Sequence, residues 1–176
     1  MRALVIYESM YGNTRAIAQA IGEGLASQGV ETAVEPVAEA DPAKFDGVEL
    51  LIVGGPTHAH GMSRVSTRQS AVDTADRKAA LSLEGSASGP GVREWLDALP
   101  DLEIAAAAFD TRIDAPAILT GRAAKGIDRK LHDIGCRRTV EPESFLVTTE
   151  NRLVDGEVDR ARVWGSMLAG RRVTTG

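Results

Sequence analysis

A short polar loop near the start of the chain has the composition of an anion-binding site. The residues Ser9-Met10-Tyr11-Gly12-Asn13-Thr14 follow an apolar run and lead into a segment with helical spacing. The first backbone N–H groups of a helix have no acceptor within it and lie at the positive end of its dipole. Ser9 and Thr14 add hydroxyl donors, Asn13 adds an amide donor, and Gly12 permits a tight turn. We expect this loop to bind a phosphate; the alternative is an ordinary helix cap with a glycine turn.

The segments around this loop alternate between strand and helix. Five short runs of apolar or alternating residues predict strands, and the second suits a sheet edge because every other residue is polar. The expected strands are 3–7, 30–35, 50–53, 104–109 and 145–147. This alternation predicts an α/β fold with a doubly wound five-stranded parallel sheet of order 2-1-3-4-5 and helices on both faces, in one domain over 1–176. Ligands then bind at the carboxyl ends of strands one and three, where the order reverses.

Apolar residues at helical spacing predict the helices between these strands. Segment 66–80 is polar with weak helical character, and 85–91 is a glycine-rich loop. We expect Trp95 and Trp164 to lie in the core with Cys136. The residues expected to point inward are Ile17, Ile21, Leu25, Val92, Trp95, Leu96, Leu99, Ile127, Leu131, Ile134, Val158, Ala161, Trp164 and Leu168.

Charge and cysteine content exclude several classes of protein. The formal net charge is −5 and the pI is near 5.3, which disfavours non-specific binding to nucleic acid or to anionic membrane. Cys136 is the only cysteine, so neither an intrachain disulfide nor a cysteine-based zinc site is expected. The apolar run at the N-terminus is too short for a signal peptide or a membrane span, and we expect a cytoplasmic protein without membrane insertion.

The first loop resembles the phosphate loop of the flavodoxin family, which has the form Ser/Thr-x-x-Gly-Asn-Thr. The matching residues are Ser9, Gly12, Asn13 and Thr14. The stretch Tyr7-Glu8-Ser9-Met10-Tyr11-Gly12 is also similar to the start of flavin-dependent NAD(P)H:quinone oxidoreductases of the same fold. The resemblance implies a flavodoxin-like fold with FMN as cofactor, its phosphate held by the first loop.

The same resemblance implies that a second loop lies against the flavin ring. This loop is Gly54-Gly55-Pro56-Thr57-His58-Ala59-His60-Gly61, and a backbone carbonyl near His58-Ala59 would face flavin N5. Two histidines at this spacing also suggest a metal site, but the only other histidine is His132, on a distant predicted helix. We therefore expect no metal, and we expect His58 and His60 to stack on the flavin or hydrogen-bond to it.

A third loop, Phe109-Asp110-Thr111-Arg112, ends the fourth predicted strand. In the family the corresponding loop contacts the pyrimidine side of the flavin through backbone N–H groups. Arg112 would either favour the anionic reduced ring or pair with Asp110 or Asp114 at the surface.

Arginines and aromatic residues leave further alternatives near the predicted ring. Arg64 and Arg68 are either solvated charges at a helix start or cations that hold an anionic substrate or the phosphate of NAD(P)H. The two ring loops contain neither Trp nor Tyr, so Tyr11 is the nearest aromatic candidate.

Three functions remain open at this point. The first is an FMN oxidoreductase that uses NAD(P)H to reduce a quinone-like or other small acceptor, with the cofactor rather than a protein nucleophile doing the chemistry. The second is a one-electron carrier that serves a redox protein. The third is a flavin-free binding domain that has kept the fold. The arginines and the Tyr7–Gly12 stretch favour the first function, and the missing ring aromatics favour the third.

Overall fold

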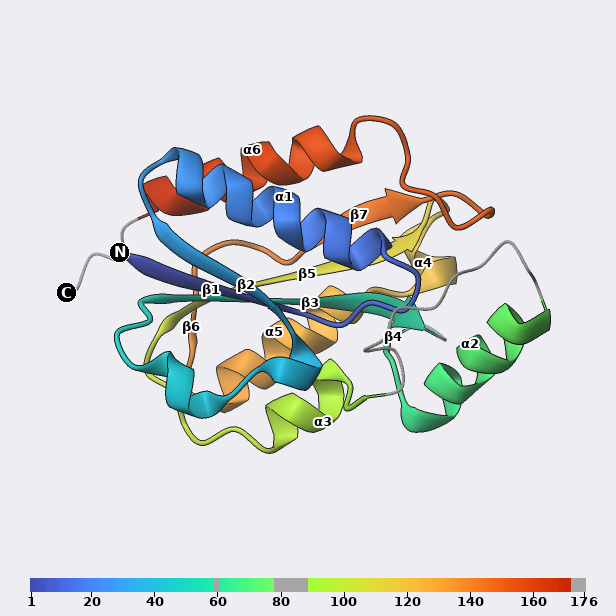
Figure 1. Cartoon of the computed structure of the whole chain (residues 1–176), viewed down its shortest axis with the longest axis horizontal. Helices are drawn as coiled ribbons and strands as arrows, with labels where there is room; N and C mark the ends of the chain where they lie inside the picture. Colours follow the sequence, from blue (N-terminus) through green and yellow to red (C-terminus); the bar gives the residue numbers. More distant parts are fainter. Residues whose placement is uncertain (59–60, 78–88, 172–176) are drawn as a thin grey trace.

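A computed structural model describes residues 1–58, 61–77 and 89–171, and its centre is a mostly parallel sheet (Figure 1). The sheet has seven strands in the order β2-β1-β3-β5-β6, with β4 paired to β3 and β7 paired to β5. The strands are β1 Arg2–Tyr7, β2 Glu31–Pro36, β3 Leu50–His58, β4 Gly61–Met62, β5 Ala105–Ile113, β6 Arg137–Arg138 and β7 Glu143–Val147.

The predicted order 2-1-3-4-5 is confirmed, with β5 as the fourth strand. The fifth position is divided between two strands, because β6 pairs with the start of β5 and β7 with its end. The remaining additional strand, β4, pairs antiparallel with the end of β3, so that His58 lies opposite Gly61. The predicted five strands are therefore found as seven, without a change in topology.

Helices cover both faces of the sheet. The α-helices are α1 Asn13–Ser27, α2 Val65–Arg77, α3 Val92–Asp97, α4 Ala117–Thr120, α5 Ala123–Asp133 and α6 Glu157–Gly170; short 3-10 helices span Val37–Glu39 and Pro42–Phe45. In Figure 1, α1 and α6 lie on one face and α3 and α5 on the other, while α2 lies beside the carboxyl end of β3. No helix in the described ranges is long and apolar enough to cross a membrane.

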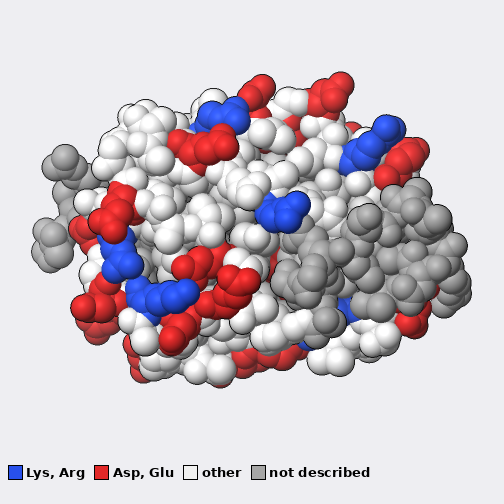
Figure 2. Space-filling view, in the orientation of Figure 1, with Lys and Arg blue, Asp and Glu red and all other residues white. Residues whose placement is uncertain are grey.

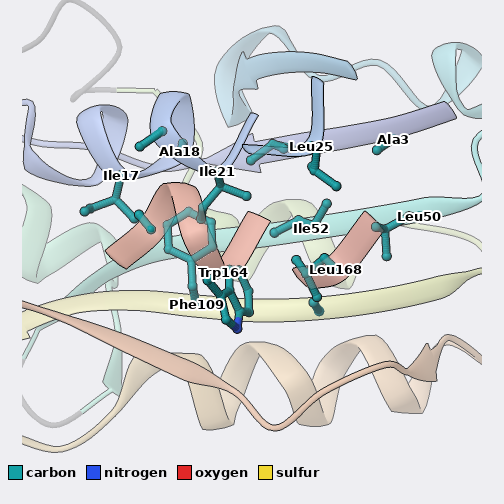
Figure 3. Close-up of a cluster of buried hydrophobic side chains, with 14 of the residues drawn as sticks. Ala3, Ile17, Ala18, Ile21, Leu25, Leu50, Ile52, Phe109, Trp164 and Leu168 are labelled. Atoms are coloured by element: carbon teal, nitrogen blue, oxygen red, sulfur yellow. The ribbon is translucent and has the colours of Figure 1, made fainter. Parts of the chain in front are cut away.

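Each face of the sheet packs its own hydrophobic core. Trp164 is buried with Phe109 and Phe145, and its ring centroid lies 6.4 Å from that of Phe109 in an edge-to-face arrangement (Figure 3). On the opposite face Trp95 is buried and meets Phe45 in the same way. Cys136 is buried in this second core. The prediction that both tryptophans and the cysteine are core residues is confirmed.

One inward-facing prediction is wrong: Val158 is 37% exposed. The first turn of α6 turns a different residue inward, because the carboxylate of Glu157 accepts a hydrogen bond from the Leu146 N–H in β7 and pairs with Arg160. A hydrogen bond from β7 to Glu157 thus replaces the apolar contact that helical spacing predicts for Val158.

Helices α1 and α6 pack backbone to backbone through two glycines. A Cβ atom on Gly24 would lie 2.0 Å from the carbonyl oxygen of Arg162, and one on Gly165 would lie 2.2 Å from that of Ile21. Any side chain at either position would therefore force the helices apart. This contact fixes the carboxyl-terminal half of α1 relative to α6.

Candidate functional site

The first polar loop connects the end of β1 to the start of α1. Gly12 has a φ of 94°, a left-handed conformation that glycine adopts without strain. Its N–H donates to Ser9 Oγ over 3.1 Å, so the Ser9 hydroxyl acts as an acceptor within the loop and keeps its own hydrogen for another partner. The turn leads into a 15-residue helix, whose first N–H groups lie at its positive end.

A hydrogen bond between two hydroxyls joins this loop to the carboxyl end of β5. Thr14 Oγ1 and Thr111 Oγ1 lie 2.7 Å apart and both residues are buried. Only one of the two hydroxyl hydrogens is used between them, so the pair still has one to donate. The structure thus brings Ser9, Thr14 and Thr111, three of the residues predicted to bind cofactor, to the same edge of the sheet.

Asn13 has a different role from the one expected of its amide. Its Nδ2 donates to both the backbone oxygen and Oδ1 of Asn151, each over 3.0 Å. Asn151 lies between β7 and α6 and has a φ of 61°, a left-handed conformation that asparagine tolerates better than most residues. The Asn13 amide therefore anchors the loop. Sequence reasoning missed Asn151, since only its turn-forming residue type distinguishes it.

The predicted ring loop is the end of the hairpin formed by β3 and β4. His58 is the last residue of β3 and is partly buried. Burial lowers the pKa of His58, and the positive charge of Arg68 lowers it further, so its imidazole is neutral at pH 7. Ala59 and His60, also predicted to contact the ring, lie outside the described residues. Pro56 and Thr57 belong to β3 itself, and Gly61 begins β4.

Two residues predicted near the flavin hold the start of α5 through their side chains. Asp110 Oδ2 accepts a hydrogen bond from the Ala124 N–H over 2.7 Å, and Thr57 Oγ1 accepts one from the Ala123 N–H over 3.0 Å. Asp110 is fully buried, and burial raises the pKa of its carboxyl group. Its Oδ2 serves the helix start, and the flavin contact expected of this residue stays a prediction.

Arg112 organises the loop that follows β5. Its Nη1 donates to the Ala115 carbonyl over 2.7 Å, to that of Ile113 over 3.2 Å and to Thr120 Oγ1 over 3.3 Å. Among the described residues it forms no ion pair with Asp110 or Asp114. The surface pairing considered for Arg112 is therefore not observed, and its charge stays beside the carboxyl end of β5.

A buried charged network, which the sequence did not reveal, lies next to the first loop. Glu8 accepts from the Ser63 hydroxyl through Oε1 and from the Val92 N–H through Oε2, the latter over 2.9 Å. Arg68 donates to Ser63 Oγ over 3.0 Å and pairs with Glu94 over 3.1 Å. Burial raises the pKa of Glu8, against the opposing effect of these hydrogen bonds.

This network corrects both interpretations of Arg68. Its side chain is 8% exposed and bonded inside the protein, so it is neither a solvated charge nor a free cation for a substrate. Gly91 makes room for the network, because a Cβ there would lie 2.2 Å from Arg68 Nη1. The pairing ties the end of β1 to the starts of α2 and α3. Arg64, by contrast, is exposed.

The flavodoxin family model matches residues 5–164, which is most of the chain. This chain belongs to the flavodoxin family. Its members bind FMN, and the donors at the start of α1 fit the phosphate of that cofactor: a left-handed glycine turn, two hydroxyl groups and a helix N-terminus. The chain is therefore an FMN-binding electron-transfer flavoprotein.

Solved structures show the same fold. A flavodoxin from the domain Archaea is 22% identical with a TM-score of 0.65, and the alignment covers 97% of each chain. Oxidised flavodoxin 1 from Bacillus cereus is 17% identical with a TM-score of 0.66, covering 98% of this chain and 99% of that one. The flavodiiron protein from Giardia intestinalis is 20% identical with a TM-score of 0.61, covering 97% of this chain but 36% of the larger protein.

Proposed function

We propose that this flavodoxin-family protein is an oxidoreductase that takes a hydride from NAD(P)H and reduces a quinone-like or other small acceptor. The observation that carries the proposal is the type of charge beside the ring loops. Arg64 lies next to the β3–β4 hairpin and Arg112 next to the end of β5, and neither pairs with a carboxylate among the described residues. Cations at these positions favour an anionic donor or acceptor.

The residues of the chain would hold and orient the cofactor. Ser9, Thr14 and the N–H groups at the start of α1 would bind the phosphate, and the hairpin at His58 and the backbone of residues 110–112 would flank the ring. FMN, when bound, supplies the hydride and electron chemistry. A positively charged Arg112 would stabilise negative charge on the pyrimidine side of the ring. Neutral His58 would present a flat π surface without adding charge.

Anaerobic stopped-flow spectroscopy of the FMN-loaded protein tests this proposal. We expect NADH or NADPH to bleach the flavin absorbance, and we expect Arg112→Gln to slow this step. The matched control is Arg137→Gln, which removes an exposed arginine beside the start of β5, at the end of that strand opposite Arg112. A loaded protein that no nicotinamide reduces, but that exchanges single electrons with a ferredoxin reductase, would be a carrier instead.

The third possibility, a flavin-free binding domain, has a separate test. The described parts of the ring loops lack Trp and Tyr, which are the side chains that stack best on a flavin. The visible spectrum of the purified protein, before and after addition of FMN, measures whether the cofactor is taken up. A protein without flavin absorbance after incubation with saturating FMN and removal of the free cofactor would reject both redox functions at once. The proposed setting for the function is the cytoplasm.

A further inference from the structure

A cavity of about 350 Å³ lies beside the predicted ring loop, between the β3–β4 hairpin and the starts of α2 and α3. Ligand pockets in proteins begin near this size, so the space suits part of a larger ligand rather than a whole dinucleotide. None of the described residues that line it carries a carboxylate. The residues used in the argument are His58, Met62, Arg64, Ser66, Thr67 and Arg93.

Two arginines give the cavity its charge. Arg93 is partly buried and held in place, because its Nε donates to the Ser63 carbonyl over 3.2 Å and its Nη2 to the Met62 carbonyl over 3.1 Å. Both acceptors are neutral carbonyl groups, so they hold the Arg93 side chain in place without balancing its positive charge. Arg64 is exposed, and neither arginine pairs with a carboxylate within the part of the chain that the structure describes. Guanidinium groups bind phosphate oxygens in a bidentate manner.

The start of α2 adds hydrogen-bond donors to the same wall. Thr67 Oγ1 accepts from the Arg64 N–H over 2.8 Å and donates to the Arg64 carbonyl over 3.0 Å, which fixes the first turn of this 13-residue helix. The exposed hydroxyl of Ser66 lies in the same turn. The positive end of the helix and the two arginines therefore contribute charge of the same sign.

His58 connects this cavity to the flavin site. It lines the cavity and also ends β3, the strand whose following loop is predicted to lie against the ring. A ligand with an anionic group between Arg64 and Arg93 would have its other end close to that ring. The phosphate loop at Ser9–Thr14 is a separate site, formed by α1 on the opposite face of the sheet (Figure 1).

We propose that this cavity is a second anion site, which binds the diphosphate of the nicotinamide dinucleotide while its nicotinamide reaches the flavin. The inference rests on the proposed function, because it names the part of the chain that would recognise the electron donor. It assigns Arg64 and Arg93 to the diphosphate and leaves Arg68 inside the buried network.

The test uses ADP-ribose, which carries the diphosphate but cannot donate a hydride. The full chain, with and without saturating FMN, is titrated while the backbone amide signals are followed by NMR. We expect shifts at Arg64, Thr67 and Arg93 in both states, and at least a tenfold weaker binding in Arg64→Gln. Arg137→Gln, which removes an exposed arginine beside the start of β5 at the opposite end of the sheet, should bind as the wild type does. Arg93→Lys keeps the positive charge but loses the planar guanidinium group that binds phosphate in a bidentate manner. It should weaken ADP-ribose binding without unfolding the hairpin.

Each result separates this inference from the proposed function. Shifts confined to Ser9–Thr14, or unchanged binding in Arg64→Gln, would overturn the second anion site. If ADP-ribose binds at the cavity but NAD(P)H never reduces the FMN-loaded protein, the anion site stands and the hydride-transfer function is rejected. If NAD(P)H reduces the flavin equally fast and with equal affinity in Arg64→Gln, the function stands and the assignment of Arg64 is wrong.

Discussion

Thr14 Oγ1 and Thr111 Oγ1 lie 2.7 Å apart, so a single hydrogen bond joins the loop after β1 to the end of β5. The two residues are separated by 97 positions in the sequence. Their contact is buried, and it fixes the spacing between the loop proposed to hold the phosphate and the loop proposed to flank the ring. Several properties of the protein should depend on this edge of the sheet.

Removal of a hydroxyl from the first loop should weaken FMN binding. We expect Thr14→Ala and Ser9→Ala each to cost about 1 to 3 kcal/mol of binding free energy, because each removes a donor to a charged phosphate. Fluorescence titration with FMN measures the loss. Riboflavin, which lacks the phosphate, should bind both variants as it binds the wild type, and Thr32→Ala on β2 is the matched control. Equal FMN affinity in both variants would contradict the phosphate assignment.

The contact between Asn13 and Asn151 should act as one unit. Asn13→Ala removes both hydrogen bonds, so we expect it to lower the free energy of unfolding by roughly 1 to 2 kcal/mol. Asn151→Ala removes only the bond to Oδ1, because the other acceptor is the backbone carbonyl, and we expect a smaller loss from that bond. The double variant should lose less than the sum of the two single losses, because both substitutions remove the bond to Oδ1, and a double-mutant cycle in urea measures the difference. Additive losses would show that the two side chains do not depend on each other.

His58 should make the stability of the folded protein depend on pH in the acidic range. Its pKa is lowered in the folded state, so the unfolded chain binds the proton first as the pH falls below its usual value of about 6.5. The wild type should therefore lose stability below pH 6.5, with a slope of at most about 1.4 kcal/mol per pH unit from this group. His58→Gln should reduce that slope, and His132→Gln should not. An identical slope in His58→Gln would remove the histidine as the cause.

The two ring-loop histidines should also affect the flavin. We expect the double replacement of His58 and His60 by alanine to weaken the binding of oxidised FMN and to flatten the pH dependence of the flavin reduction potential. Spectroelectrochemistry between about pH 5.5 and 8 measures this dependence across the usual pKa range of histidine. If affinity and potential are both unchanged, the backbone alone holds the ring.

Glu8 should have the opposite pH dependence from His58. Burial raises its folded pKa above 4.5, so its contribution to stability is complete below that value and is lost as the pH rises through the folded pKa. A glutamine side chain at this position does not titrate. The stability of Glu8→Gln relative to the wild type should therefore increase from about pH 4 to pH 7. Chemical denaturation at several pH values measures the difference. Glu103→Gln, at an exposed position, should show no such trend.

The glycine contact between α1 and α6 predicts a large cost for a single methyl group. We expect Gly24→Ala to lower the free energy of unfolding by about 2 to 3 kcal/mol, because the new Cβ would meet backbone that cannot move away easily. Gly170→Ala, where a Cβ meets nothing within 4 Å, should cost little or increase stability. Thermal unfolding of both variants checks the contrast.

The sequence was sufficient for the topology because periodicity reports which side of an element is buried. The continuous apolar runs of β1 and β3 and the alternation in β2 indicated central and edge strands, and the pairing confirms them. Val158 failed because spacing cannot show that Glu157 takes the inward position to bind β7. The single domain over 1–176 stays a prediction.

The sequence predicted which loops meet at the carboxyl edge of the sheet, but not the partners of their side chains. Ser9, Gly12 and Thr14 could be named as candidates because the glycine and the two hydroxyl groups lie in one short segment of the chain. The tasks of Thr57, Asp110 and Arg68 depend on partners that folding supplies from distant segments, and no local pattern shows them. The predicted flavin contacts of the ring-loop residues stay predictions.

The anchor that Asn13 finds on Asn151 has a consequence for how the protein is made. The two residues are separated by 138 positions, and α1 also needs the glycine surface of α6 for its packing. A nascent chain that has emerged from the ribosome only as far as β5 has the first loop without either support. The ribosome adds residues at about 5 to 20 per second, so this unsupported interval lasts several seconds. We therefore expect capture of the cofactor to follow synthesis of the last helix rather than to accompany translation.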